Sequence, residues 1–251
     1  MEKKILSSNL ESSSFQNKIL TLLGEEAIKD SRLIESIANL YAQVFAGPPW
    51  NEFCRCSCCN KFYGQEQSIG LPSPCCSESL IEAYPLAETS DYIRKELAEK
   101  NALLTYLVNS NNEIFGFAWG YQSTPQQFAG EKYQTQKMRQ TIINLLNSAG
   151  LPEELPIYYF SECGIEENNR GKGYANILTQ EIIETAKSLG LPLLMRTNCQ
   201  SPMVAVAQKF GMKQFFGPKM IYQNSQIIIT GRVINGMDLE NPNRVLFIKI
   251  Y

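Results

Sequence analysis

The chain has 251 residues, of which 44% are apolar, and a formal net charge of −2. This is enough apolar material for a full core, and the slight negative charge gives no general attraction to nucleic acid or to anionic membranes. Histidine is absent from the sequence, which excludes histidine bases, histidine-containing triads and mixed cysteine–histidine zinc sites. Any anionic ligand must therefore be held by a local feature of the chain.

The N-terminal part predicts a lead-in followed by one amphipathic helix. Residues 1–24 are rich in Ser, Asn and Lys, with one short strand or helix expected around Lys18–Leu23. From Glu25 onward apolar residues recur at three- and four-residue spacing, and Gly47-Pro48-Pro49 ends this predicted helix. The first residues lack the apolar centre of a signal peptide, and no stretch reaches the ~18 to 20 apolar residues that span a bilayer. We therefore expect a cytoplasmic protein with no membrane partner.

Six of the eight cysteines lie in one short segment that follows this helix. In a reducing cytoplasm such crowding favours thiolate metal binding over a disulfide framework. Cys56 and Cys59 form a C-x-x-C pair, and Asn60 accepts the left-handed turn that such a knuckle needs. The expected ligands of a structural Zn²⁺ are Cys56, Cys59, Cys75 and Cys76.

The cysteine segment leaves two alternatives open. Cys54 or Cys58 could replace one of the four expected ligands, and the segment could instead be a redox-labile or partly disulfide-bonded loop. Its only basic residues between Cys54 and Cys76 are Arg55 and Lys61, too few for good phosphate contacts. We therefore expect no nucleic-acid partner, and a lid or wall beside a substrate pocket fits this segment better.

The middle of the chain predicts alternating helices and strands. A helix is expected from Ser90 to Glu99, and two strands around the Asn109–Asn112 turn then form an antiparallel hairpin over residues 102–108 and 113–121. A polar helix is expected from Gln126 to Ala149, where Gly150 helps to end it.

The second half of the chain contains the clearest strand–helix–strand unit. A buried strand over 157–165, a helix over 174–189 and a strand over 193–197 imply a right-handed crossover with parallel pairing of the two strands. A short helix over 202–210 follows. Two strands over 227–233 and 244–250 close the chain, separated by Asn-Gly and Asn-Pro-Asn turns.

The loop between the buried strand and its helix has the character of an anion cradle. Gly171 and Gly173 let the backbone approach a ligand, and the free N–H groups and positive dipole end of the following helix favour a negative charge. Arg170 adds a forked donor and Lys172 a mobile charge, so a diphosphate suits the loop. A plain glycine-rich connection is the alternative. The loop lacks the endings of both a Walker loop and a dinucleotide fingerprint.

The run Arg170-Gly171-Lys172-Gly173-Tyr174-Ala175 matches the Arg/Gln-x-x-Gly-x-Gly/Ala signature of the GCN5-related N-acetyltransferases (GNAT). The chain resembles that superfamily also in Glu113–Ala118, which is similar to its third strand, and in Phe210-Gly211-Met212, which is similar to the end of its last helix. The resemblance predicts a lead-in over 1–24 and one acyltransferase domain over 25–251, interrupted by a cysteine-rich insertion over 51–80.

The resemblance implies a mixed α/β (α+β) fold. In it a mostly antiparallel sheet carries a central parallel strand pair, splayed at the cofactor site, with helices on both faces. Acetyl-CoA is the implied co-substrate. The residues expected to bind it are the strand residues Cys163, Gly164 and Ile165 and the loop residues Arg170, Gly171, Lys172, Gly173, Tyr174 and Ala175.

The family's chemistry is direct attack of an amine on a thioester, and Glu162 is the candidate general base. An edge-facing glutamate without a catalytic role is the alternative. The position that often carries a tyrosine general acid is Ala207 here, so another tyrosine or a water protonates the leaving thiolate, or the enzyme is slow, or the chain only binds acyl-CoA. Cys163 as a covalent nucleophile is disfavoured, because no histidine can activate it.

These features predict an N-acetyltransferase that acts on a primary amine of a small molecule or peptide. The alternative is a non-catalytic acyl-CoA sensor, or an interaction module with a structural zinc.

Overall fold

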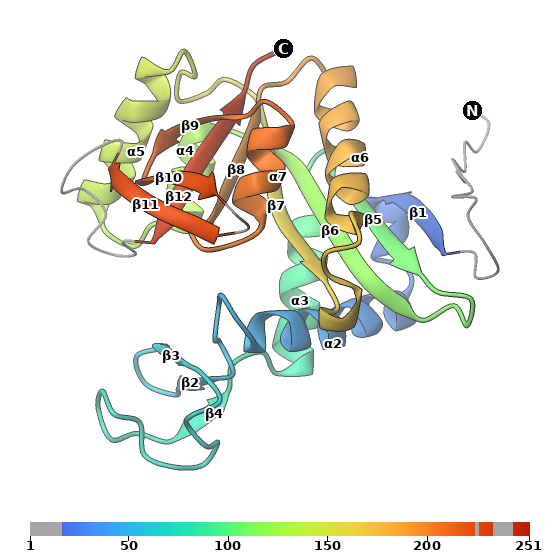
Figure 1. Ribbon diagram of the computed structural model, residues 1–251, viewed down its shortest axis with the longest axis vertical. Coiled ribbons are helices and arrows are strands. Elements are labelled where there is room, and N and C mark those ends of the chain that lie inside the picture. The colour runs from blue at the N-terminus through green and yellow to red at the C-terminus, as the bar shows by residue number, and fades with distance from the viewer. Residues whose placement is uncertain (1–16, 224–225, 233–242) are drawn as a thin grey trace. The chain divides into compact units, whose positions relative to one another are not determined.

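The computed structural model describes residues 17–223, 226–232 and 243–251 (Figure 1). Most of the predicted lead-in, and all but Asn243 of the Asn-Gly and Asn-Pro-Asn turns near the C-terminus, lie outside the described residues. The chain divides into two compact units. The first comprises the described parts of Met1–Ala98, Leu103–Ala118 and Glu162–Leu178, and the second those of Glu99–Ala102, Trp119–Ser161 and Thr179–Tyr251.

The main sheet has seven strands in the order β1-β5-β6-β7-β8-β12-β9, which confirms the predicted mixed fold. The pairings of β1 with β5 and of β12 with β8 and β9 are antiparallel, whereas β7 and β8 are parallel, with a register from Tyr158↔Leu193 to Phe160↔Met195. The predicted parallel pairing of these two strands is therefore confirmed. The strands are β1 Lys18–Leu23, β5 Leu103–Val108, β6 Ile114–Ser123, β7 Ile157–Ile165, β8 Leu193–Asn198, β9 Lys213–Phe216 and β12 Arg244–Lys249.

The first unit contains helices α1 Gly24–Ala27, α2 Ser31–Ala46 and α3 Leu86–Leu97. The prediction of one helix from Glu25 is wrong, because Asp30 starts a new helix: its side chain accepts hydrogen bonds from the N–H groups of Arg32 and Leu33 at 3.0 Å. Helix α2 buries its apolar stripe and packs against α3, which begins four residues earlier than predicted.

The cysteine-rich segment forms a small antiparallel sheet of its own within the first unit. Its strands are β2 Cys54–Cys56, β3 Phe62–Tyr63 and β4 Leu80–Glu82, in the order β3-β2-β4. The sequence reading did not predict these strands, which are too short to carry a detectable periodicity.

The second unit contains helices α4 Pro125–Lys132, α5 Gln136–Ser148 and α7 Met203–Lys209, most of α6 Tyr174–Ser188, and the hairpin of β10 Pro218–Gln223 with β11 Gln226–Arg232. The prediction of one long helix from Gln126 is wrong. Thr124 caps α4 and Thr135 caps α5, and each accepts a hydrogen bond from a backbone N–H group. The helical structure is therefore interrupted between Lys132 and Gln136. Strands β9 and β10 were not predicted.

The core of the second unit lies between its strands and the pair α4–α5. Tyr159 and Leu194, neighbours on β7 and β8, belong to the same buried cluster as Phe128 of α4 and Ile142 of α5. Successive residues of β7 from Ile157 to Phe160 are all buried, so both faces of this strand are covered.

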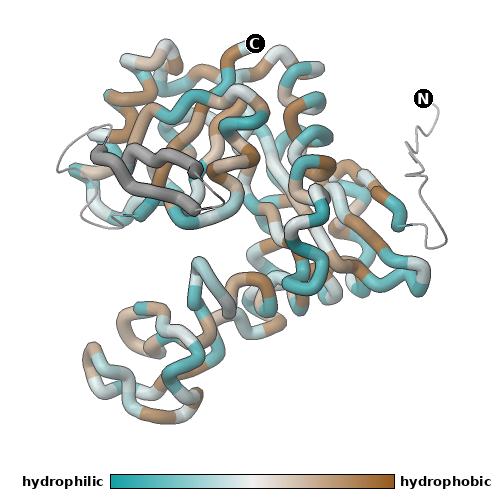
Figure 2. Tube along the Cα trace, viewed as in Figure 1, coloured by the Kyte–Doolittle hydropathy of each residue, from teal (hydrophilic) through white to brown (hydrophobic). Residues whose placement is uncertain are grey.

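The hydropathy of the chain follows this arrangement. Brown and teal alternate along the helices, as expected for helices with one face toward a core (Figure 2). Among the described residues, no helix combines the length and the apolar character needed to cross a bilayer.

Candidate functional site

The loop from β7 to α6 lies in the first unit and has the backbone shape that its glycines predict. After a 3₁₀ turn at Glu167–Asn169, Gly171 and Gly173 have φ angles of +76° and +84°, in the left-handed region that side chains disfavour. A Cβ at Gly171 would meet nothing within 4 Å, and one at Gly173 would meet only the Asn176 amide at 3.9 Å. Both glycines are exposed, so the space above the loop is open to a ligand.

The guanidinium of Arg170 is tied to backbone carbonyls. Its Nε donates to the carbonyl of Ile165 at 3.0 Å, and its two other nitrogens donate to the carbonyls of Val44 and Pro48 at 3.4 Å. Because Val44 lies in the last turn of α2, this cation also sits at the negative end of that helix. Arg170 therefore anchors the loop on α2, and its contact with a cofactor stays a prediction.

The other predicted loop residues line the start of α6. Lys172 is exposed, and its Nζ lies 3.1 Å from Oδ1 of Asn169. The first helical turn after Gly173 carries Tyr174 and Ala175 and no acidic residue. The ring of Tyr174 packs edge-on against Phe115, with 5.0 Å between centroids. The start of a helix offers unpaired N–H groups, and here a cation lies nearby and the first turn has no acidic residue, a combination suited to an anion.

Glu162 lies on β7 and is held by two tyrosines that are distant in the sequence. The hydroxyl of Tyr92, on α3, donates to Oε1 of Glu162 at 3.0 Å, and the hydroxyl of Tyr41, on α2, donates to the same oxygen at 3.4 Å. Burial, reinforced by the charge of Glu162, raises the pKa of Tyr41 well above its usual value, so this hydroxyl keeps its proton and stays a donor. The carboxylate is only partly buried.

An aromatic cluster surrounds Tyr41 beside this carboxylate. We define it as the rings that contact Tyr41, with centroids 4.3 to 6.1 Å from its own: Phe45, Tyr84, Tyr92 and Phe117. Its members come from α2, α3, β6 and the segment before α3. The cluster gives Glu162 an aromatic neighbourhood of low polarity, in which its polar contacts gain strength.

The tyrosines of this site were not found from the sequence. Tyr41 fits the apolar spacing of the helix predicted from Glu25, which indicates packing, and no pattern distinguishes Tyr92. The residues lie 121 and 70 positions from Glu162, and no local pattern links a helical tyrosine to a strand carboxylate at such separations.

Gly164 and Cys163 follow Glu162 on β7. A Cβ at Gly164 would lie 2.5 Å from the ring of Phe117, so only glycine lets β7 pass this close to the aromatic cluster. Burial, with a contribution from Glu162, raises the pKa of Cys163 to about 12. Cys163 is therefore a thiol near neutral pH, which makes it a poor nucleophile.

If the chain has the transferase activity that the sequence predicts, replacing Cys163 by serine is expected to leave its rate within about threefold of the unmodified protein, because a protonated thiol is a poor nucleophile. Steady-state rates at pH 7.5 check this. Iodoacetamide at pH 8, followed by peptide mass analysis, is expected to leave Cys163 unmodified in the folded chain. Loss of activity in Cys163→Ser, or acetyl groups recovered on Cys163, would contradict the expectation.

The remaining predicted positions are also located. Ala207 is fully buried in α7 and offers no proton donor. Four of the cysteines converge: the Sγ atoms of Cys56, Cys59, Cys75 and Cys76 all lie within 4.8 Å of one another.

Comparisons with known proteins found one family model and several solved structures similar to this chain. The model of the acetyltransferase (GNAT) family matches residues 73–212. No curated protein sequence matches the chain. Among solved structures, arylalkylamine N-acetyltransferase 2 from Aedes aegypti is 15% identical, with a TM-score of 0.49 and coverage of 93% of this chain and 98% of that chain. A polyamine N-acetyltransferase from Drosophila melanogaster is 11% identical, with a TM-score of 0.49 and coverage of 93% and 100%. Identities this low carry no substrate from one protein to another.

Proposed function

The chain belongs to the acetyltransferase (GNAT) family, whose model matches more than half of its residues, and from this premise we propose that it transfers an acetyl group from acetyl-CoA to a primary amine. The observation that carries the proposal is the pairing of an open glycine loop at the start of α6 with a hydrogen-bonded carboxylate, Glu162, on the strand that leads into that loop. The acceptor is the amine of a small molecule or a peptide.

The loop residues would bind the acetyl-CoA diphosphate. Gly171 and Gly173 leave the space that its oxygens need, the N–H groups of the first turn of α6 would bond to those oxygens, and Lys172 supplies a mobile charge. Arg170 keeps the loop in place through its contacts with α2. The backbone of Cys163, Gly164 and Ile165 would then run along the pantetheine arm. A thioester bound there supplies an activated acetyl carbon and a thiolate leaving group.

Glu162 would act on the acceptor. Primary amines are mostly protonated near neutral pH and cannot attack until a base removes a proton. The carboxylate is partly exposed, and the hydroxyl groups of Tyr41 and Tyr92 donate to it and fix its direction. It can accept the proton directly or through one water. A backbone N–H of β7 would hold the charge that develops on the carbonyl oxygen.

The expected position of the general acid that would protonate the leaving thiolate is occupied by Ala207, which has no proton to donate. A thiolate is a stable leaving group in water, and we propose that solvent returns its proton. An alternative follows from the same alanine: the chain could bind acyl-CoA as a sensor without turning it over.

One assay separates the two functions. The purified chain is incubated with acetyl-CoA and a panel of primary amines, including arylalkylamines, polyamines and peptide N-termini, and free CoA is followed with a thiol reagent. We expect amine-dependent CoA release for at least one class, with the acetylated amine identified by mass spectrometry. Tight acetyl-CoA binding without release over the whole panel would favour the sensor.

A further inference from the structure

The cysteine-rich segment brings four sulfur atoms to one point. Cys56 is the last residue of β2, Cys59 lies in the turn after it, and Cys75 and Cys76 come from the loop before β4. The Sγ atoms of Cys56 and Cys76 are 3.1 Å apart, and those of Cys59 and Cys75 are 3.2 Å apart. We propose that these four cysteines bind one Zn²⁺ ion as a closed structural site.

The sulfur positions fit a tetrahedral ion. Zinc–sulfur bonds of ~2.3 Å place the four sulfurs of a tetrahedron ~3.8 Å apart. The four Sγ atoms lie between 3.1 Å and 4.8 Å from one another, so shifts of several tenths of an ångström to about 1 Å bring them to that spacing. Cys54 is buried elsewhere and Cys58 is exposed, and neither belongs to the group.

Backbone N–H groups point at the sulfur atoms of the first cysteine pair. The N–H groups of Cys59 and Cys58 donate to Sγ of Cys56, and the N–H group of Lys61 donates to Sγ of Cys59. The turn closes through the N–H of Asn60, which bonds the carbonyl of Cys56 at 3.0 Å, and Asn60 has a φ of +57°.

The second pair of cysteines has the same kind of support. The N–H of Glu78 donates to Sγ of Cys76 across Ser77, whose φ is +62°. The buried Ser73 hydroxyl lies 3.3 Å from Sγ of Cys56 and donates to it. A metal-bound sulfur accepts such hydrogen bonds from the residues around it. Two disulfides would need no such donors.

The segment lacks the core that would otherwise hold it. Its three strands have three, two and three residues, and most residues between Cys58 and Glu78 are exposed. Short chain segments without a sufficient apolar core depend on metals or disulfides for their structure. A four-thiolate ion would close the loop from Cys59 to Cys75 and leave no open position for catalysis.

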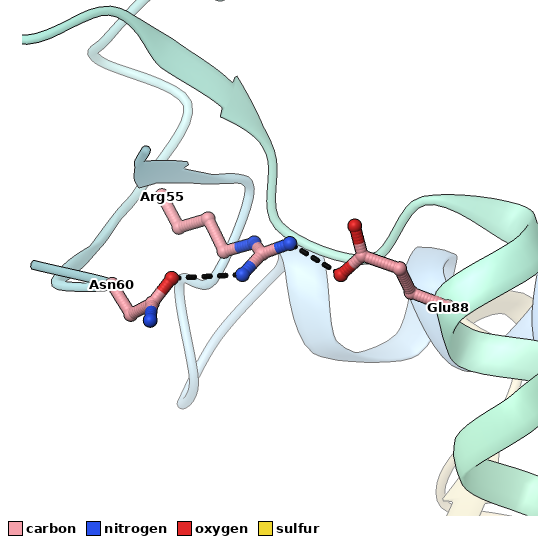
Figure 3. A network of polar contacts seen from close by, with 3 residues as sticks. All are labelled: Arg55, Asn60 and Glu88. Carbon is pink, nitrogen blue, oxygen red and sulfur yellow. Dashed lines mark hydrogen bonds and ion pairs between the residues drawn. The ribbon is translucent and has the colours of Figure 1, made fainter. Parts of the chain in front are cut away.

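The knuckle is also fastened to the rest of the first unit (Figure 3). Arg55, between two cysteines of β2, donates to Oδ1 of Asn60 at 2.8 Å and forms an ion pair with Glu88 near the start of α3. On the next strand, the ring of Phe62 stacks on Tyr84 of the aromatic cluster, 5.8 Å between centroids. The metal would therefore support the polypeptide that packs beside Glu162.

Metal analysis of the purified full chain tests this proposal. After removal of any affinity tag, we expect elemental mass spectrometry to find about one zinc ion per chain. Cys59→Ser and Cys75→Ser are expected to lose most of this zinc, whereas the matched control Cys58→Ser, one residue from Cys59, keeps it. Because the ligand variants could unfold, Co²⁺ added to the metal-stripped unmodified chain provides a second measurement, with the visible bands of a tetrahedral thiolate site expected.

Several outcomes would overturn the zinc site. One is a folded chain that carries no zinc and gives an octahedral Co²⁺ spectrum. Another is an intact mass, measured without reductant, in which the four cysteines are joined in disulfides. Equal zinc loss in Cys58→Ser and Cys59→Ser would also contradict it. None of these outcomes depends on acetyl transfer, so the zinc site and the proposed activity can fail separately.

Discussion

Replacement of Gly173 by glutamate is expected to weaken acetyl-CoA binding by about 100-fold or more, equivalent to ~2.7 kcal/mol. The glutamate places a negative charge where the diphosphate would lie, and like charges ~4 Å apart near a protein surface repel by up to ~4 kcal/mol. The carboxylate can also accept from the N–H groups at the start of α6 and so occupy the anion site itself. Since a Cβ at Gly173 meets only Asn176, at 3.9 Å, the fold tolerates the added volume.

Two controls separate charge from backbone strain. Gly173 has a φ of +84°, where a side chain costs ~1 to 2 kcal/mol. Gly150, after α5, has a φ of +86° and nothing within 4 Å of a Cβ, so Gly150→Glu carries the same strain and the same charge away from the loop. Isothermal titration with acetyl-CoA is expected to show unchanged affinity for Gly150→Glu and a small loss for Gly173→Ala. Equal affinity of Gly173→Glu and the unmodified chain for acetyl-CoA would contradict the assignment of this loop as the acetyl-CoA site.

The parts of the fold that the sequence predicts are those encoded by local patterns. The strand over 157–165 matches β7, and the helix predicted over 174–189 ends one residue later than α6. The continuous apolar run of the strand and the regular apolar stripe of the helix each favour one type of secondary structure over the other. The loop between them could also be predicted from the local sequence. Its shape depends on the positive φ angles of Gly171 and Gly173, which glycine adopts readily.

The helix errors arose where an apolar period continued across a cap. Ile28 fits the spacing of the helix that follows it, yet α1 ends at Ala27 and Asp30 caps the start of α2. In the same way, α4 ends at Lys132 and Thr135 caps the start of α5. Both residue types are strong N-caps, so a search for caps inside long predicted helices would have placed these breaks.

The environment of Glu162 could not be predicted from the sequence, because it depends on three elements that meet only after folding. The sequence identified the carboxylate by its place on a strand. The structure adds Tyr41 and Tyr92 from two helices, both bonded to one oxygen, and the aromatic cluster behind them. The four cysteines differ in this respect, since their crowding in the sequence already limited which sulfurs could meet.

Replacement of Glu162 by glutamine is expected to lower kcat/KM for the best amine of the panel by ~10²- to 10⁴-fold at pH 7.5, the contribution typical of a positioned base. The amide keeps the size of the side chain and can still accept from Tyr92, so acetyl-CoA affinity is expected to stay unchanged. Without the base, only amine already deprotonated in solution reacts, and the residual rate should rise about tenfold per pH unit below the pKa of the amine.

The pH profile distinguishes this role from a structural one. A carboxylate that only supported the fold would lower the rate equally at all pH values, whereas loss of a base is relieved as the pH rises. Tyr92→Phe removes one of the two hydroxyl groups that hold the carboxylate in its direction, so a smaller loss of rate than in Glu162→Gln is expected. Glu35→Gln, on the exposed face of α2, is the matched control and should behave as the unmodified chain. A Glu162→Gln rate within about fivefold of the control at every pH would remove Glu162 from the chemistry and leave the loop at Gly173 as a binding site alone.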